Sequence, residues 1–214
     1  DVTVGTNDVG WAEDQEKISV SKVLPHPGWD NIEKGPDFAI LTLSKPAKLS
    51  RGINTVCMPT FSNKHFLGIP GKTLSVAGWG TTSINGDTTD QLKKVKVKII
   101  AKEICNNYKT WNEKYDSCLK PINKDEGTCP GDSGGPYTMK VNGRSTAIGL
   151  VSRGSTEDCS DKSIMTAITP SINDWIVQNS KEVMDSSCFL SRTQININIF
   201  CRVDHNGNVK CRRS

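Results

Sequence analysis

Short stretches of β-branched or alternating residues constrain the fold of this chain more than any other feature. Gly, Pro, Asn and Asp separate these stretches, which is the pattern of strands joined by turns. The stretches that we expect to form strands are Ile18–Leu24, Asp37–Leu43, Lys72–Ala77, Lys94–Ile100 and Ala147–Ser152. Two helices are expected over Lys102–Lys109 and Ser171–Asn179, and Pro170 suits the first turn of the second. The sequence therefore predicts an all-β fold.

Lysines alternate with apolar residues in the expected strand Lys94–Ile100, whose sequence is KVKVKII. Successive side chains of a strand point to opposite faces, so Val95 and Val97 should pack inward while the lysines face water. A stripe that binds polyanions is the alternative for this face. A solvated strand face is favoured over it.

Composition narrows the class of protein. The chain has 214 residues, 35% of them apolar and 23% charged, and no apolar run approaches the roughly 18 residues that cross a bilayer. The net charge is +4, and the lysines are scattered rather than gathered into a block with aromatic residues. We therefore expect neither a membrane nor a nucleic acid as a partner.

The eight cysteines form an even set without C-x-x-C pairs, which favours disulfides formed in an oxidising compartment. We therefore expect a secreted, extracellular protein. The sequence shows no signal peptide and begins at Asp1, so we expect that it is not a whole translation product.

The last part of the chain, residues 181–214, differs in character from the rest. It holds Cys188, Cys201 and Cys211 and ends in an alternating stretch with a turn. A loop over 205–207, with glycine in the left-handed position, would pair Val203 with Val209 and Cys201 with Cys211. This segment is therefore predicted to be an extension that carries a small hairpin closed by a disulfide.

Ser133 lies in the sequence CPGDSGGP, between Asp132 and two consecutive glycines. Small neighbours suit a serine on a tight turn that a substrate must approach closely. They also leave the amides of Gly131 and Ser133 free to stabilise an oxyanion. A surface turn rich in Gly and Ser is the alternative for a bare G-D-S-G, but the full motif in a strand-rich chain with paired cysteines favours a nucleophile.

The chain resembles the chymotrypsin/trypsin family of serine endopeptidases from about residue 1 to about residue 179. The resemblance rests on PDFAILTL with Asp37, VCMP with Cys57, AGWG over 78–80, CPGDSGGP, LVSRG over 152–154, and the closing helix with Trp175. Asp37 and Ser133 lie 96 positions apart, against about 93 in the family template.

The resemblance implies two antiparallel β-barrels with the active site between them, the first barrel here lacking its front strands. The implied parts are a partial first barrel (1–57), a connection (58–71), a second barrel with its closing helix (72–180) and the extension (181–214). The implied roles are nucleophile for Ser133 and orienting carboxylate for Asp37. Asp132 would pair with an amino terminus released by zymogen cleavage.

The same template places the general-base histidine about 45 residues before the aspartate, which falls ahead of Asp1. The histidines present are His26, His65 and His205, and each is expected to be solvated rather than catalytic. We therefore expect negligible peptidase activity from residues 1–214 alone.

The resemblance also implies two disulfides, Cys105 with Cys118 and Cys129 with Cys159. With the hairpin pair assigned, Cys57 and Cys188 remain, and a bond between them would fasten the extension to the body. An unpaired Cys57 would instead mean that its partner lies upstream.

By position, Gly127 would lie at the floor of the substrate pocket, with Ser152, Gly154 and Ser163 along its walls, and Thr128 would also belong to the pocket. A glycine floor favours an apolar or small substrate side chain over Arg or Lys. Arg153 replaces the usual tryptophan, and Ser163 stands where glycine is common, so we expect a partly blocked pocket. Asp161, projecting inward, would instead favour basic side chains.

The sequence thus predicts a secreted serine endopeptidase, with protein or peptide substrates and protein inhibitors as partners. We expect a monomer with no cofactor and no metal. The alternative is a secreted, catalytically dead homologue that binds partners in a regulatory role. A third hypothesis makes the extension itself an interaction module.

Overall fold

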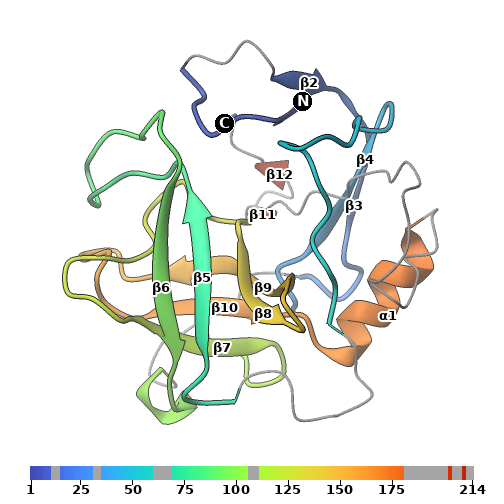
Figure 1. Cartoon of the computed structure of the whole chain (residues 1–214). Coiled ribbons are helices and arrows are strands. Elements are labelled where there is room, and N and C mark those ends of the chain that lie inside the picture. Colours follow the sequence, from blue (N-terminus) through green and yellow to red (C-terminus); the bar gives the residue numbers. More distant parts are fainter. Residues whose placement is uncertain are drawn as a thin grey trace.

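The computed structural model describes residues 1–10, 15–30, 35–59, 69–105 and 111–180, and the backbone of 202–203 and 209–210. These residues form an all-β fold with one α-helix (Figure 1). The strands of residues 1–43 lie on one side of the molecule, and a closed barrel formed by later strands lies on the other. This arrangement confirms the expected all-β architecture.

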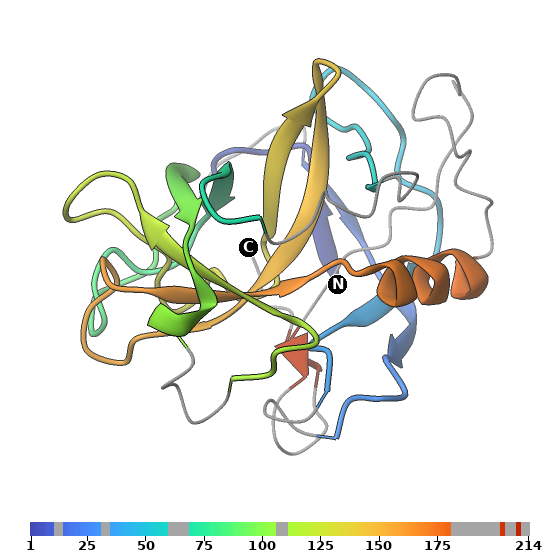
Figure 2. The same cartoon turned by 90° about the horizontal axis from the view of Figure 1, so that it is seen from below.

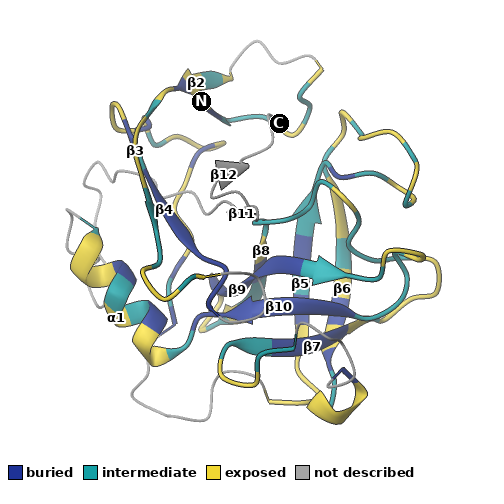
Figure 3. Cartoon of the chain, turned by 180° about the vertical axis from the view of Figure 1, so that it is seen from behind, coloured by how far each residue is buried: buried dark blue, intermediate teal, exposed yellow. Residues whose placement is uncertain are grey.

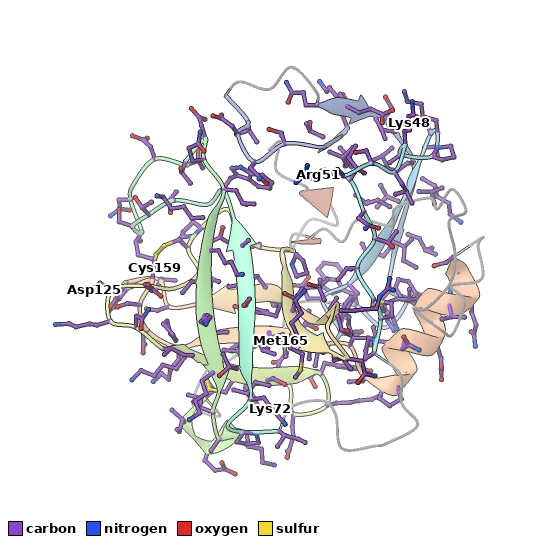
Figure 4. The ribbon with its side chains drawn as sticks, in the orientation of Figure 1. Lys48, Arg51, Lys72, Asp125, Cys159 and Met165 are labelled. Carbon is purple, nitrogen blue, oxygen red and sulfur yellow. A yellow bond between two sulfur atoms is a disulfide. The ribbon has the colours of Figure 1, made fainter. Side chains whose placement is uncertain are left out.

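Six antiparallel strands close the second barrel in the order β10-β7-β6-β5-β8-β9. The strands are β5 (Thr73–Gly78), β6 (Lys93–Ile99), β7 (Asp116–Pro121), β8 (Pro136–Val141), β9 (Arg144–Gly154) and β10 (Ser163–Ala167). Their inward side chains, including Val97, Leu119 and Met165, form a buried core. Figure 4 shows Met165 inside the barrel. Alternation along β5 and β6 separates this core from an outer, solvated face, whereas β10 is buried at every position.

Two antiparallel pairs represent the first barrel. They are β1 (Val2–Val4) with β2 (Glu16–Ile18), and β3 (Val20–Pro25) with β4 (Ala39–Leu43). Val2, Ile18 and Leu41 belong to a second buried cluster, separate from the barrel core. Figure 3 shows the buried colour running along β4 and along β9 and β10.

The helix α1 (Pro170–Asn179) joins the two halves. Thr169 caps it, accepting a hydrogen bond from the Ile172 amide at 3.3 Å, and Pro170 stands at the helix start. Ile172 and Ile176 are buried with Phe38 of the first half and Leu150 of the second. Figure 2 shows α1 lying against the first-half strands at the end of β10. Burial of this apolar face therefore fixes the helix against both halves.

A tight turn joins β8 to β9. Asn142 has φ 49° and Gly143 has φ 79°, which are the left-handed conformations that two-residue hairpin turns require. The register pairs Val141 with Arg144 directly across this turn.

Two local predictions were wrong in detail. The expected strand Ile18–Leu24 is divided at Ser19, because Ile18 pairs with β1 whereas Val20 pairs with β4. The described part of the expected helix Lys102–Lys109 is a 3-10 turn, η1 (Lys102–Ile104).

The expected hairpin of the extension is confirmed in its backbone pairing. Val203 pairs with Val209 between β11 (Arg202–Val203) and β12 (Val209–Lys210). The predicted Cys201–Cys211 bond lies outside the described residues.

Candidate active site

Asp37 stands two residues before the start of β4 and is 5% exposed. It accepts a hydrogen bond at 2.8 Å from the hydroxyl of Ser152, which is fully buried on β9. A buried carboxylate needs such a partner, because an unpaired charge away from water is costly. The contact brings residues 115 positions apart together and ties the first half to the barrel.

The Ser133 loop connects β7 to β8 and is held by β9. The amide of Gly134 donates to the Val151 carbonyl at 2.8 Å, and the Val151 amide donates to the Gly135 carbonyl at 2.9 Å. Gly134 has φ 85° and Gly131 has φ 107°, so the motif needs glycine at both positions. Val151 precedes Ser152 in the chain, and the loop and Asp37 therefore bind neighbouring residues of one strand.

The amides of Gly131 and Ser133 have no hydrogen-bond acceptor among the described residues. The neighbouring amides of Asp132, Gly134 and Gly135 do have one. Two free donors beside a half-buried serine are what an oxyanion site requires.

The Asp132 carboxylate accepts hydrogen bonds from the amides of Gly80 and Cys129, each at 2.9 Å. A Cβ added at Gly78 or Gly80 would overlap this carboxylate, which explains the two glycines of the AGWG motif. Burial raises the pKa of Asp132, while the two amides act in the opposite direction.

Asp132 also lies on the wall of a cavity of about 280 Å³. Gly78, Gly127 and Thr128 share this wall, and Lys93 and Lys94 contribute cationic side chains.

Arg153 forms a buried ion pair with Asp116 of β7. Their side chains are 10% and 3% exposed, and the Asn112 amide also donates to Asp116, at 2.7 Å. Arg153 donates at 3.0 Å to the Ser152 hydroxyl, which in turn donates to Asp37. Burial raises the pKa of Asp116 to about 6, while Arg153 favours the ionised form. The sequence did not indicate Asp116, because its partner lies 37 positions away.

Gly127 lies against the backbone of Cys159, and a Cβ at position 127 would overlap the Cys159 carbonyl oxygen. The Cys129–Cys159 disulfide joins the two segments with a Cα–Cα distance of 5.1 Å, which confirms the predicted pair. Figure 4 places Cys159 and Asp125 at the same end of the barrel. A side chain at position 127 therefore cannot fit without movement of the backbone.

Three other predicted pocket residues are brought together at this end of the barrel by β8, β9 and β10. Ser163 pairs with Gly154 in the β9–β10 register. Tyr137 of β8 is fully buried, and its hydroxyl lies 3.2 Å from Ser163 Oγ and 3.4 Å from Thr128 Oγ1. Burial raises the pKa of Tyr137, which stays neutral. Sequence reasoning missed Tyr137, although it stands only four positions after Ser133.

His26 has contacts of its own. Its Nδ1 accepts from the Gly28 amide at 3.0 Å, and its ring packs against Trp175 with centroids 4.7 Å apart. Burial lowers the pKa of His26, and the nearby Lys114 lowers it further. His65 and His205 lie outside the described residues.

The disulfide Cys105–Cys118 is also formed, as predicted. Cys57 is disulfide-bonded as well. The other described cysteines bond to one another, so the partner of Cys57 lies outside the described residues. The predicted Cys57–Cys188 bond thus stays a prediction.

Other features do not add to this site. A hollow of about 460 Å³ lies between η1 and β7, lined by Trp111 and Tyr115 among others, and does not include Ser133. Within the described ranges, no three His, Cys, Asp or Glu side chains gather closely enough to bind a metal ion. In the same part of the chain, no helix combines the length and apolar character of a membrane span.

Comparisons with known proteins agree with this geometry. The family model described as trypsin matches residues 1–176. Chymase of Canis lupus familiaris is 31% identical over 182 residues, which cover 83% of this chain and 70% of that protein. Chymase of Rattus norvegicus is 31% identical over 136 residues, or 63% of this chain and 54% of that protein. The solved structure entitled "Structure of GrC" superposes with a TM-score of 0.71 at 29% identity, covering 82% of this chain and 75% of that one.

Proposed function

The chain belongs to the trypsin family of serine proteases, and from this membership we propose that it is a secreted serine endopeptidase that cleaves peptide bonds through an acyl-enzyme. One observation carries the proposal. Asp37 binds Ser152 of β9, and the Ser133 loop binds the preceding residue, Val151. Carboxylate and nucleophile are thereby fixed by the same strand, which is the preorganisation that acyl transfer requires.

In the proposed reaction, Ser133 Oγ attacks the scissile carbonyl carbon. A histidine takes the hydroxyl proton as general base and later gives it to the leaving amine. Asp37 orients that histidine and stabilises its charged form. The amides of Gly131 and Ser133 donate to the oxyanion of the tetrahedral intermediate.

The proposed partner of Asp132 is an α-ammonium group in the adjoining cavity. The half-buried carboxylate has a raised pKa, and a cation beside it would lower that pKa. The same cavity wall includes Gly127 and Thr128, so a bound amino terminus would also brace the predicted substrate pocket.

Residues 1–214 by themselves are proposed to be inactive. Among the described residues, His26 is engaged by Gly28 and Trp175 rather than held in readiness for Ser133. Without a base the serine hydroxyl remains a weak nucleophile.

The test compares residues 1–214 with protein expressed from its complete coding sequence, using peptide thioesters and a fluorophosphonate label for Ser133. The complete protein should turn over thioesters and take the label. Ser133→Ala should lower kcat by at least roughly 10⁴-fold, whereas Ser145→Ala, at an exposed position of β9, should change it little.

Turnover by residues 1–214 that Ser133→Ala abolishes would contradict the inactivity of this segment. A complete protein that neither turns over substrate nor takes the label would contradict the endopeptidase and favour the dead homologue.

The proposed substrate pocket is shallow and uncharged at its floor. Gly127 leaves no room for an acidic side chain, and the hydroxyls of Tyr137, Thr128 and Ser163 meet where the predicted floor and walls converge. We therefore expect cleavage after small or medium uncharged side chains. The competing expectation is that Asp161 projects into the pocket, in which case the enzyme would prefer to cleave after Lys or Arg.

A substrate panel on the complete enzyme separates these expectations. Tyr137→Leu should raise kcat/KM for Phe over Ala substrates by about tenfold, because removing the phenol deepens the pocket. Tyr137→Phe keeps the ring and should change this ratio much less. Dominant cleavage after Lys or Arg by the wild type, lost in Asp161→Asn, would support the competing expectation instead.

The extracellular location and the peptide or protein substrates are parts of the same proposal. The disulfides Cys105–Cys118 and Cys129–Cys159 support an oxidising compartment. Protein inhibitors and a monomeric state remain expectations from the family resemblance.

A further inference from the structure

The outer face of the second barrel concentrates lysines that the sequence shows only as an alternating row. On β6, Lys94, Lys96 and Lys98 are exposed, while Val97 and Ile99 between and beside them pack into the core. The side chains therefore split between the two faces as the alternation predicted. The row of lysines is a feature of the folded surface.

Neighbouring strands extend this row sideways. Lys98 pairs directly with Lys120 of β7. On the other side, Ser75 of β5 pairs with Lys96 and with Thr138 of β8, and Lys140 follows two positions after Thr138 on the same face. We call Lys72, Lys94, Lys96, Lys98, Lys120 and Lys140 the lysine face.

Lys72 closes one end of the lysine face. It stands just before β5, and its carbonyl accepts a hydrogen bond from the Ile99 amide at 2.8 Å, which places it beside the end of β6. Figure 4 shows Lys72 at this end of β5. The face therefore spans four adjacent strands of the barrel.

The lysine face has no carboxylate within ion-pair distance among the described residues. Three lysines elsewhere are paired: Lys17 with Asp1 at 3.3 Å, Lys45 with Glu16 at 2.9 Å, and Lys102 with Glu113. The whole chain carries a net charge of only +4, less than the lysine face alone. The lysine face therefore carries more positive charge than the whole chain, and over the remaining residues acidic side chains offset the basic ones.

The neighbours of the lysines narrow the class of ligand. Between the lysines stand the small residues Thr73, Ser75, Ala77 and Thr138. No aromatic ring stands among these residues on which a base could stack. Ile122, whose amide donates to the Lys96 carbonyl at 3.1 Å, is 49% exposed, but a single isoleucine is not the apolar face that enters a lipid layer. Recognition here depends mainly on charge, and the lysines recur about 7 Å apart along a strand and about 5 Å apart across strands. A linear chain with a dense, repeating negative charge fits such a surface.

We propose that the lysine face binds a sulfated polysaccharide. Ammonium groups on flexible stems act as point charges toward sulfate, and binding releases the counterions of the polyanion. The lysine face centres on β6, three strands from β9 in the barrel order. Of its lysines, Lys94 also lines the cavity beside Asp132. The proposal does not depend on catalysis, and residues 1–214 suffice to test it.

The probe is a fluorescent heparin decasaccharide, and the readouts are its Kd at 0.15 M NaCl and the slope of log K against log salt. The face variant is Lys96→Gln, Lys98→Gln and Lys120→Gln together. The control variant is Lys17→Gln, Lys45→Gln and Lys102→Gln, which removes the same net charge.

The face variant should bind at least about tenfold more weakly, with a salt slope shallower by roughly two to three. The control should change Kd less than about twofold. In the wild type, bound heparin should protect Lys96, Lys98 and Lys120 from acetylation measured by mass spectrometry, but not Lys17 or Lys45. This second readout needs no variant to fold.

Three outcomes would overturn the proposal. The first is no measurable binding at 0.15 M NaCl, or equal binding of the desulfated decasaccharide. The second is equal weakening in the control variant, which would make binding an effect of net charge. The third is equal or tighter binding of single-stranded DNA of matched charge or of phosphatidylserine vesicles, which would assign the face to another partner.

Discussion

Gly127, at the floor of the proposed substrate pocket, is a position where the neighbouring backbone leaves no room for a side chain. Its neighbour is the Cys159 carbonyl, which the Cys129–Cys159 disulfide holds in place. Any side chain here must displace main chain, and main chain moves less readily than the end of a flexible side chain.

Gly127→Ala should therefore lower the free energy of unfolding by on the order of 2–3 kcal/mol, as overpacking does elsewhere. Gly154→Ala is the matched control on the opposite wall, because its Cβ would lie 3.6 Å from the Ser163 Cβ, an ordinary contact. Urea denaturation measures both. Equal losses in the two variants would disprove the steric explanation.

The ion pair between Arg153 and Asp116 should contribute to stability in a way that depends on pH. Above about pH 6 the buried Asp116 carboxylate is ionised, and the Arg153 guanidinium then balances its charge. Below about pH 6 Asp116 is protonated and neutral in the folded protein. Because this pKa is raised by folding, Asp116 contributes less to stability as the pH rises from about 4 through about 6.

Arg153→Met should therefore destabilise strongly at pH 7.5, by on the order of 3 kcal/mol, and clearly less at pH 5. Denaturation curves at the two pH values measure the difference. Arg144→Met removes an exposed arginine from the start of β9 and should show no such pH dependence. A loss in Arg153→Met that is the same at both pH values would contradict the pairing with ionised Asp116.

The sequence pointed to those candidate site residues that lie within a short, recognisable motif. Asp37, Asp132 and Ser133 stand in distinctive neighbourhoods. In the structure Asp37 accepts from Ser152, Asp132 accepts from the Gly80 amide, and the glycine after Ser133 donates to Val151, while the predicted roles stay predictions. Tyr137 and Asp116 could not be predicted in this way. Their partners lie 26 and 37 positions away, and only the strand register brings them together.

At the scale of elements, the alternation of the lysines predicted which side of β6 faces solvent, but not what lies opposite. The register that pairs Lys98 with Lys120 depends on where β7 begins, which no local pattern specifies. Likewise, the expected strand is interrupted at Ser19 because the residues before it pair with β1 and those after it pair with β4. The sequence on both sides favours an extended chain and gives no sign of this interruption.

Like charges directly opposite in an antiparallel pair destabilise it. Lys120→Gln should therefore raise the melting temperature by about 1–2 °C in low salt, and the gain should vanish near 1 M NaCl. Differential scanning calorimetry measures the shift. Lys22→Gln on β3 is the control, because Lys22 pairs with the uncharged Thr42. An equal gain in the control, or a gain that survives high salt, would argue against repulsion between Lys98 and Lys120.

At the scale of the whole molecule, the sequence predicted a second barrel with a closing helix, and the structure has both. It did not predict how the halves meet. Phe38, just before β4, and Ile40 within it pack with Leu150 of β9 and with Ile172 and Ile176 of α1, in a cluster shared by both halves. Such a cluster is invisible in the sequence because each of its members reads as an ordinary core residue of its own element.

The shared cluster predicts that the halves lose their structure together. Ile176→Ala should destabilise both, by about 3 kcal/mol, because it empties a fully packed position. Hydrogen exchange followed by mass spectrometry should then show faster exchange in β4 and in β9 alike. Val177→Ala, at an exposed helix position, is the control. Faster exchange confined to α1 would mean that the halves are independent.

The turn between β8 and β9 has a consequence for proteolysis. Asn142 and Gly143 form this turn, and the Cys129–Cys159 bond encloses the turn and both strands. A protease that cut the chain at the turn would therefore release nothing. The fragment bearing Ser133 would stay joined to the fragment bearing Ser152 by a covalent bond, and the cut would become visible only on a reducing gel.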